Sequence, residues 1–260
     1  NDYAQFCRAL ASEVGVPFRS DLVDVRARAA RLGTSLEDAG RQARYELFER
    51  VATELGADVV ATGHTRDDQA ETFLLRLLRG AGPRGLAGIH PRTPLPTSAP
   101  RDLGLPAVAP QARDLGLPAV APKARDLGLP AVAPKARRWA VRPVLDCGRD
   151  ELRAYLASLG QPFREDESNR DLSIPRNRVR HELLPLLARD YSPGITDVLA
   201  REAEIARQDE ERLQHEAIDL AGLIVLRNER GSSGEVDAVE LDVLALTALH
   251  PAIAVRVLRL

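Results

Sequence analysis

Methionine is absent from the 260-residue sequence, including position 1, and lysine occurs only at Lys123 and Lys135. Cys7 and Cys147 are the two cysteines; they lie far apart and form no paired motif. We therefore expect reduced thiols in a cytoplasmic protein. No run of 18 apolar residues is present, and the first residues lack the pattern of a signal peptide, so no membrane span is expected. The missing methionine predicts that the natural start of the protein lies upstream.

Arginine supplies 34 of the 36 basic residues, although the net charge is only −2. Residues 101–142 contain eight basic and three acidic residues, a net charge of +5, whereas residues 201–250 contain five basic and twelve acidic residues, a net charge of −7. A polyanion would therefore prefer the middle of the chain to its C-terminal part. Scattered, solvated charge is the alternative interpretation.

The first 80 residues alternate helical and extended patterns. Residues 4–14 have helical spacing, and residues 16–25 have the pattern of a short strand. Residues 35–55 carry an apolar stripe behind the candidate cap Ser35. Residues 57–63 form a short β-branched run, typical of a strand buried on both faces of a parallel sheet. Thr65 and Asp68 have capping-box spacing before a helix that extends to about Leu78. This order predicts an α/β fold with a doubly wound, mainly parallel sheet.

A 12-residue unit, RDLGLPAVAPQA or RDLGLPAVAPKA, occurs three times over 101–136. Its prolines and glycine disfavour helix and central strand, so we expect an exposed, disordered insert at about 97–137, with a small hairpin array as the alternative. Beyond it, the pattern predicts a helix opened near 147–149 and a long amphipathic helix over 195–223. A Gly/Ser turn at 231–234 then precedes a strand and a helix. We place domains at 1–190 and 191–260, the second a helical linker with a partial α+β domain.

Polar and acidic residues that could bind a ligand occur at the end of the predicted strand at 57–63 and directly after it. Gly63 and His64 follow it, at the edge where ligands of α/β sheets bind. Asp67, Asp68 and Glu71 come next, more acids than capping needs, and Asp68 and Glu71 share a helix face. Two carboxylates on one face can bind an ammonium group or Mg²⁺. An acid-rich, solvated first turn and a structural histidine remain the alternatives.

The stretch ATGHTRDDQAETFLLRLLRGAGPRGLAGI resembles the tRNA(Ile)-lysidine synthetases, members of the N-type ATP pyrophosphatase (PP-loop) superfamily with an adenine nucleotide alpha hydrolase-like fold. The similarity continues upstream in GRQARYELFERVATELGADVVATGH. It reappears downstream in VRPVLDCGRDELRAYLASLGQPFREDESNRDLSIPRNRVRHELLPLL. These segments cover about 40–195 apart from the repeat. Residues 191–260 resemble the family's helical linker and the start of its tRNA-recognition domain.

The resemblance implies ATP-dependent ligation of free lysine to C2 of cytidine 34, in the CAU anticodon of tRNA(Ile), through an adenylated intermediate. It implies that Asp68 and Glu71 recognise lysine and that Arg44, assisted by Arg41, stabilises charge at the α-phosphate of ATP. It places Gly63 and His64 in the nucleotide pocket, implies Mg²⁺ as a cofactor, and leaves a homodimer open. It also implies phosphate contacts with tRNA from a basic cluster, whose members are Arg176, Asn177, Arg178 and Arg180. The alternative for that cluster is a surface helix that pairs with the acids at 165–167.

The sequence departs from the family in two respects. The repeat insert interrupts the region between the two blocks of family motifs. The Ser-Gly-Gly-x-Asp-Ser loop that grips the ATP pyrophosphate in this superfamily does not occur in the 260 residues. We therefore expect that these residues alone do not adenylate tRNA. Two rival interpretations remain open: a related tRNA thiolase, which the unpaired cysteines disfavour, and a tRNA-binding remnant without catalysis.

Overall fold

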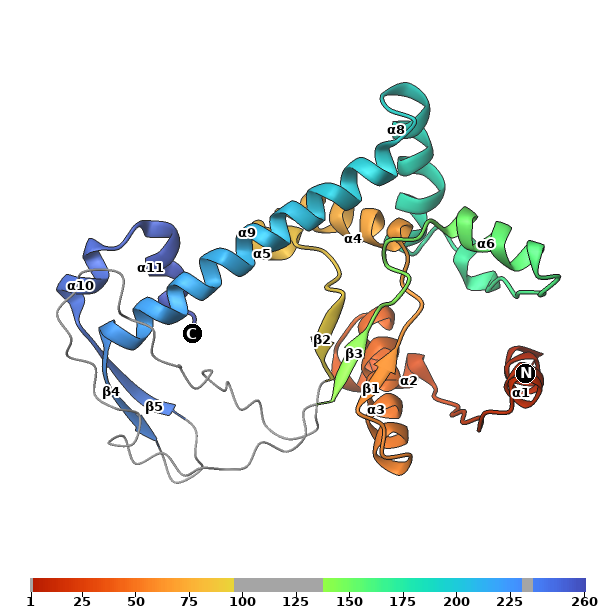
Figure 1. Ribbon diagram of the computed structural model, residues 1–260, viewed down its shortest axis with the longest axis horizontal. Coiled ribbons are helices and arrows are strands. Elements are labelled where there is room, and N and C mark those ends of the chain that lie inside the picture. Colours follow the sequence, from red (N-terminus) through yellow and green to blue (C-terminus); the bar gives the residue numbers. More distant parts are fainter. Residues whose placement is uncertain (1, 96–137, 231–235) are drawn as a thin grey trace.

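The computed structural model describes residues 2–95, 138–230 and 236–260 (Figure 1). The repeat at 101–136 and the Gly/Ser turn at 231–234 lie outside the described residues. The first part contains these elements in order: α1 (Asp2–Val14), α2 (Val25–Leu32), α3 (Leu36–Glu54), β1 (Val59–Ala61), α4 (Arg66–Leu78), α5 (Pro83–Leu86) and β2 (Arg92–Pro94).

The predicted helix starts are confirmed because their capping groups are local in the sequence. Ser35 accepts a hydrogen bond from the backbone N–H of Asp38 and begins α3. Thr65 and Asp68 form the predicted capping box of α4: the Asp68 carboxylate accepts the Thr65 backbone N–H at 2.8 Å, and the Thr65 hydroxyl accepts that of Asp68. Each cap satisfies backbone donors that a helix start leaves unpaired.

The predicted strand at 16–25 is wrong. Residues 16–24 are irregular, and α2 begins at Val25 behind Asp24, whose side chain accepts the N–H of Ala27. Pro17 has no N–H to donate, and no described strand lies beside this segment to pair with it. A segment with an apolar pattern forms a strand only where another strand can pair with it. The residues of the segment itself do not show whether such a partner is present.

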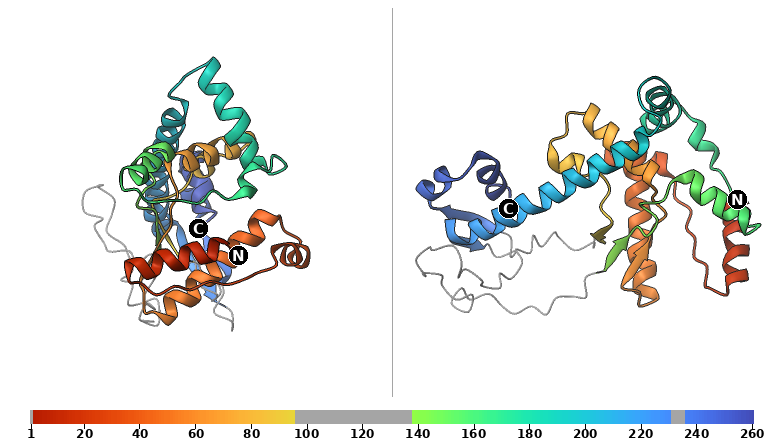
Figure 2. Two further views of the ribbon diagram at one scale, coloured as in Figure 1. Left: turned by 90° about the vertical axis from the view of Figure 1, so that its right-hand side faces the viewer. Right: turned by 45° about the horizontal axis from the view of Figure 1, so that its top comes forward.

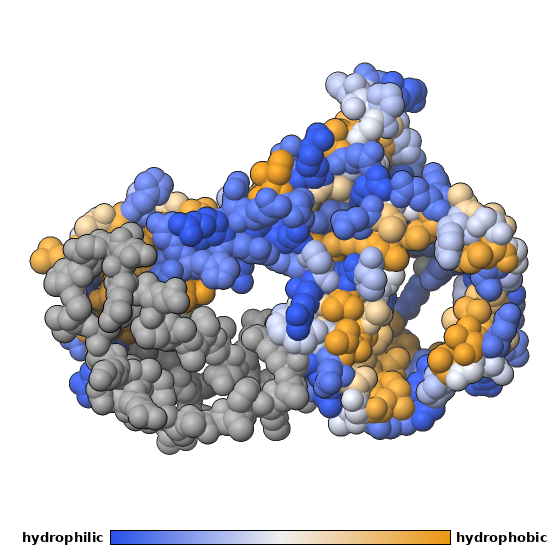
Figure 3. Space-filling model, in the orientation of Figure 1, coloured by the Kyte–Doolittle hydropathy of each residue, from blue (hydrophilic) through white to orange (hydrophobic). Residues whose placement is uncertain are grey.

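The three-stranded sheet has the order β1-β3-β2, with β3 at Trp139–Val141. Val60 pairs with Ala140 in parallel, and Thr93 pairs with Ala140 from the antiparallel side. The α/β character is present, but the described sheet is small and mixed and contains one parallel pair. The expectation that β1 is buried on both faces is also wrong, because Val59 is 51% exposed. Hydrophobic residues are visible at the surface around β1 and α3 in Figure 3.

The second part is mostly helical. Its elements are α6 (Arg149–Ser158), the 3₁₀ helix η2 (Glu167–Arg170), α7 (Pro175–Arg178), the π-helical turn η3 (Val179–Leu183), α8 (Leu184–Asp190), α9 (Ile195–Ile224), β4 (Val225–Arg230), β5 (Val236–Leu241), α10 (Val243–Ala248) and α11 (Pro251–Val257). The predicted long helix at 195–223 is confirmed as α9, which has 30 residues and so a length of about 45 Å.

Helix α9 joins two hydrophobic clusters, and Figures 1 and 2 show it running from α4 and α8 to α10 and α11. The first cluster packs α4, η3, α8 and α9 together; its buried members are Ala70, Phe73, Leu74, Val179, Leu184, Leu199 and Ala203. The second packs α9 against α11; its buried members are Ala217, Ala221, Ile253 and Val257. The first cluster fixes α4, and with it the acidic turn that follows β1.

Candidate functional site

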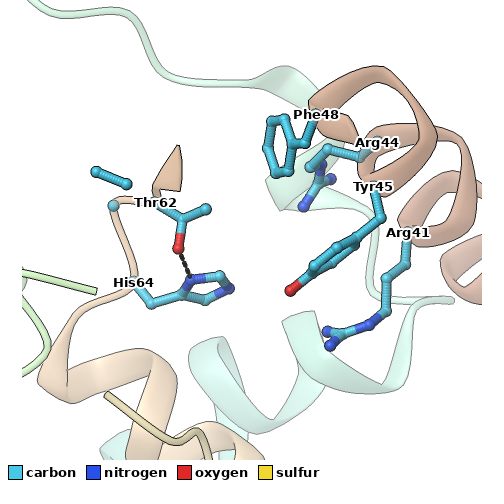
Figure 4. Close-up of a pocket in the computed structure, with 8 residues that line it drawn as sticks. Arg41, Arg44, Tyr45, Phe48, Thr62 and His64 are labelled. Carbon is cyan, nitrogen blue, oxygen red and sulfur yellow. Dashed lines mark hydrogen bonds between the residues drawn. The ribbon is translucent and has the colours of Figure 1, made fainter. Parts of the chain in front are cut away.

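A cavity of about 400 Å³ lies between α3 and the carboxyl end of β1 (Figure 4). One wall comes from the segment after β1, and the other is one face of α3, because residues at i, i+3, i+4 and i+7 share a helix face. The lining residues are Arg41, Arg44, Tyr45, Phe48, Ala61, Thr62, Gly63 and His64. The structure thus brings together four predicted site residues: Arg41, Arg44, Gly63 and His64. Sequence reasoning missed Tyr45 and Phe48, although their spacing from Arg41 places them on the same face.

The cavity is positively charged. Among the described residues, neither Arg41 nor Arg44 has a carboxylate within ion-pair distance. Behind them Arg142, which is only 6% exposed, donates to the carbonyl oxygen of His90 at 2.7 Å and to the Thr93 hydroxyl at 3.0 Å. It also has no described carboxylate partner, and its Nε has no hydrogen-bond acceptor in the described part of the chain. Three arginines without acidic partners make the cavity suited to an anion.

His64 is half-buried at the end of β1. Its Nδ1 lies 2.9 Å from the Thr62 hydroxyl oxygen, which also lies 3.4 Å from the carbonyl oxygen of Val141. Burial lowers the pKa of His64, and the positive charges of Arg142, Arg176 and Arg41 act in the same direction, whereas Asp68 opposes them. The imidazole is therefore neutral at pH 7 and has one ring nitrogen available as an acceptor.

Glu71 is fully buried and binds one arginine from each of three helical elements, α6, α7 and η3. Arg180 makes a two-pronged contact, with Nε 2.7 Å from Oε1 and Nη2 3.0 Å from Oε2. Arg176 places its Nε 2.8 Å from Oε2, and Arg149 places Nη2 3.2 Å from Oε1. Because both oxygens are engaged and no surface is exposed, the carboxylate compensates these guanidiniums within the fold.

Asp68 extends the same cluster toward the helix start. Its Oδ1 lies 3.1 Å from Nη2 of Arg176, and its Oδ2 accepts the backbone N–H of Thr65. Burial alone would raise the pKa of Asp68, but the hydrogen bonds from Thr65 and the charges of Arg176 and Arg149 outweigh it, so the pKa lies below the ordinary value. Asp68 is therefore ionised near pH 7, and its carboxylate is partly exposed.

The predicted basic cluster is divided by the structure. Arg176 and Arg180 turn inward and contact Glu71 and Asp68. Asn177 is buried and donates to the carbonyl oxygen of Asp171 at 2.9 Å. Arg178 points outward, with 65% of its side chain exposed.

Arg149 was missed by sequence reasoning, although it opens α6 close to the acids. Its backbone N–H donates to Asp67 at 2.7 Å, and its side chain reaches Glu71 across 78 positions of sequence. The sequence pattern at 147–149 predicted the start of this helix. It did not predict that the helix start contacts Asp67 and Glu71. Because these contacts are made between distant segments, spacing within one segment could not predict them.

The described residues contain no group of three or more histidine, cysteine or acidic side chains that could hold a metal ion. The acids nearest the cavity bind guanidinium and backbone N–H groups, and so do not fit a ready-made Mg²⁺ site. Nor does any helix in the described ranges have the length and apolarity needed to cross a membrane.

A cationic cavity at the carboxyl end of a parallel strand, beside a capped helix start, defines an α/β protein of the kind that binds phosphorylated ligands. Residues 1–187 match the family model described as the PP-loop domain. The chain therefore belongs to the PP-loop domain family.

Several relatives matched over most of the chain are named tRNA(Ile)-lysidine synthase. The chain is 39% identical over 217 residues to the protein of Geobacter sulfurreducens, a match that covers 82% of this chain and 37% of the relative. It is 37% identical over 232 residues to the protein of Deinococcus deserti, covering 86% of this chain and 35% of the relative. It is 34% identical over 212 residues to a protein of Thermus thermophilus, a match that covers 82% of this chain and 32% of the relative. The chain thus spans about a third to two fifths of the length of these relatives.

Proposed function

We propose that the protein is a tRNA(Ile)-lysidine synthetase, which uses ATP to join lysine to C2 of cytidine 34 in the CAU anticodon of tRNA(Ile). One structural observation carries the proposal. The cationic cavity lined by Arg41, Arg44 and His64 lies next to the acidic start of α4, so a candidate anion site and a candidate cation site are neighbours. Adenylation of a base followed by attack of an amine requires this pairing, and the named relatives support it.

Arg44 and Arg41 have the role of holding the phosphates of ATP and stabilising the negative charge that develops at the α-phosphate. Neither has an acidic partner among the described residues, so an incoming phosphate does not have to displace one. Gly63 has open space where a side chain would begin, which lets a ligand approach the backbone closely. His64, neutral at pH 7, contributes a hydrogen-bonding group and no charge.

We assign the lysine ammonium group to the acidic start of α4. Asp68 is partly exposed and ionised, so it is the carboxylate that an ammonium group can reach directly. Glu71 has no exposed surface, and direct contact with lysine requires displacement of an arginine side chain. In the structure as it stands, Glu71 acts by holding Arg176 and Arg180 in position around Asp68.

For tRNA we propose one direct phosphate contact, and for Mg²⁺ we propose no protein ligand. Arg178 is the exposed member of the basic cluster and is the first candidate for a phosphate contact, whereas Arg176, Asn177 and Arg180 shape the surface beneath it. Mg²⁺ that accompanies ATP is held in part by the phosphates, so we assign it no protein ligand. Homodimer formation stays a prediction, for sedimentation measurements to test.

Two reactions of the natural protein test the proposal: ATP–pyrophosphate exchange in the presence of tRNA(Ile), and transfer of radioactive lysine to that tRNA. Arg44→Ala should reduce both by about 100-fold or more, as expected for loss of a charge-stabilising group. Arg50→Ala is the matched control, because Arg50 lies on the same helix and pairs with Asp21 at the surface. No lysine transfer by the unaltered protein, or equal rates for the Arg44 and Arg50 variants, would contradict the proposal.

A further inference from the structure

The hydroxyl group of Tyr45 accepts one hydrogen bond and can donate another. Nη2 of Arg142 lies 3.2 Å from the phenolic oxygen, and because a guanidinium can only donate, the oxygen is the acceptor. No acceptor for the hydroxyl hydrogen occurs within the part of the chain that the structure describes. Figure 4 shows the hydroxyl pointing into the cavity, on the side of His64. Tyr45 therefore offers a hydrogen-bond donor to whatever occupies the cavity.

The ring of Tyr45 is fixed by its neighbours. The guanidinium carbon of Arg41 lies 5.0 Å from the ring centroid, and the ring of Phe48 meets it edge-on at 5.7 Å and 65°. Arg142, which holds the oxygen, is buried and anchored to His90 and Thr93. Contacts on the face, edge and oxygen restrict rotation of the ring, so the donor has a defined direction.

His64 offers the complementary group from the opposite wall. When the Thr62 hydroxyl donates to the carbonyl oxygen of Val141, it can only accept from His64, so Nδ1 carries the hydrogen. The lone pair then belongs to Nε2, for which the described residues provide no partner. In Figure 4 this nitrogen faces the cavity, on the side where the Tyr45 hydroxyl points. A donor and an acceptor therefore converge on one space.

We propose that Tyr45 and His64 form a donor–acceptor pair that recognises the edge of an aminated nucleobase, where a ring nitrogen lies next to an exocyclic amino group. Cytosine presents this edge as N3 and N4, and adenine as N1 and N6. The Tyr45 hydroxyl donates to the ring nitrogen, and Nε2 of His64 accepts from the amino group. The inference rests on the proposed function and adds to it two residues that select the base.

The pair also explains how the wrong base is rejected. Uracil and hypoxanthine carry a ring N–H and a carbonyl oxygen at the corresponding positions, so in the same pose a donor meets a donor and an acceptor meets an acceptor. Polar groups left unpaired in this way lower affinity by more than the good pair gains. The cavity of about 400 Å³ has the volume of a small-molecule site, and the aromatic rings of Tyr45 and Phe48 line it.

The test is equilibrium binding of CMP, UMP, AMP and IMP to the natural protein, measured by calorimetry with inorganic pyrophosphate as a separate ligand. We expect a preference of at least about tenfold for CMP over UMP, for AMP over IMP, or for both. A preference for CMP identifies cytosine as the base that is read, and a preference for AMP identifies adenine. Tyr45→Phe keeps the ring but removes the donor, and should abolish that preference. His64→Phe, which removes the acceptor, should do the same. Tyr191→Phe is the control, because Tyr191 is 78% exposed and remote in sequence.

The outcomes separate this inference from the function on which it rests. A preference that survives in both the Tyr45 and His64 variants would overturn the base-reading pair and leave the proposed ligase intact. The same holds if none of the four nucleotides binds while pyrophosphate binds and lysine transfer proceeds. Failure of lysine transfer by the unaltered protein would overturn the proposed function, whatever the nucleotides do. A purely structural Tyr45 would shift the thermal midpoint of Tyr45→Phe without changing the ratio of CMP to UMP affinity.

Discussion

Arg180 and Glu71 form a two-pronged ion pair between segments that lie 109 positions apart, with Nε–Oε1 and Nη2–Oε2 distances of 2.7 and 3.0 Å. Glu71 has no exposed surface, so its charge depends on the arginines for compensation, and they depend on it. The pair fixes the π-helical turn after α7 against α4. The acidic motif after β1 is therefore held in place by distant cations, as well as being available to a ligand at its exposed end.

Replacing Glu71 with glutamine should destabilise the fold strongly. The variant leaves Arg176 and Arg180 partly buried with one charged partner fewer, and loss of one member of a buried ion pair costs about 3 kcal/mol. Urea unfolding followed by circular dichroism measures this free energy. Glu165→Gln is the control, because Glu165 pairs with Arg153 at the surface, where an ion pair contributes about 0–1 kcal/mol. Similar unfolding midpoints for the two variants would contradict the compensating role of Glu71.

Replacing Asp68 with asparagine tests the lysine assignment. Loss of a charge-assisted contact should raise KM for lysine by about tenfold or more, while pyrophosphate exchange, which does not use lysine, continues. The asparagine oxygen can still accept the Thr65 N–H, so the cap of α4 is largely kept. Asp150→Asn is the matched control on the exposed first turn of α6. If KM for lysine were unchanged in the Asp68 variant, the ammonium site would have to lie elsewhere.

Gly88 is predicted to be intolerant of alanine. Its φ is +62°, and a Cβ would lie 2.6 Å from Oε1 of Gln69, the atom that accepts the backbone N–H of Ile89. Gly80→Ala is the control, since Gly80 has φ +73° but open space around it and incurs only the left-handed strain of about 1–2 kcal/mol. Gly88→Ala should lower the free energy of unfolding by about 1–2 kcal/mol more, because it also disturbs buried hydrogen bonds.

A double-mutant cycle identifies the cause. If the damage acts through Gln69, adding Gln69→Ala to the Gly88 variant should cost much less than Gln69→Ala alone, because the two residues are in contact. Additive losses would show that the contact with Gln69 is not the origin of the effect.

The features that the sequence predicted correctly are those whose causes are local. Ser35 and Thr65 cap helices through groups three residues away, and Arg41 and Arg44 share a face because of helical spacing. The strand expected at 16–25 required a partner strand, and the inward direction of Arg176 required Glu71, 105 positions away. Neither partner follows from local pattern. Tyr45 could have been found, since it follows Arg41 by four residues.

The titration of His64 gives the last prediction. Burial lowers its pKa below 6.5; Arg142 from the end of β3, Arg176 from α7 and Arg41 from α3 lower it further, and Asp68 from α4 raises it. NMR titration of the ring should therefore give a pKa below 6.5. Because the folded protein binds a proton less readily than the unfolded chain, the contribution of His64 to stability is complete above pH 6.5. It falls as the pH drops through 6.5 toward the folded-state pKa.

His64→Asn provides the comparison for this effect. The variant has no imidazole to protonate in either state, so the part of the stability loss below pH 6.5 that belongs to His64 should disappear, as measured by urea unfolding at each pH. The affinity for CMP or AMP in the unaltered protein should decline over the same range, because a protonated Nε2 donates and can no longer accept from an amino group. A ring pKa at or above 6.5, or base affinity that stays constant as the pH falls through the measured ring pKa, would show that Nε2 of His64 is not the acceptor.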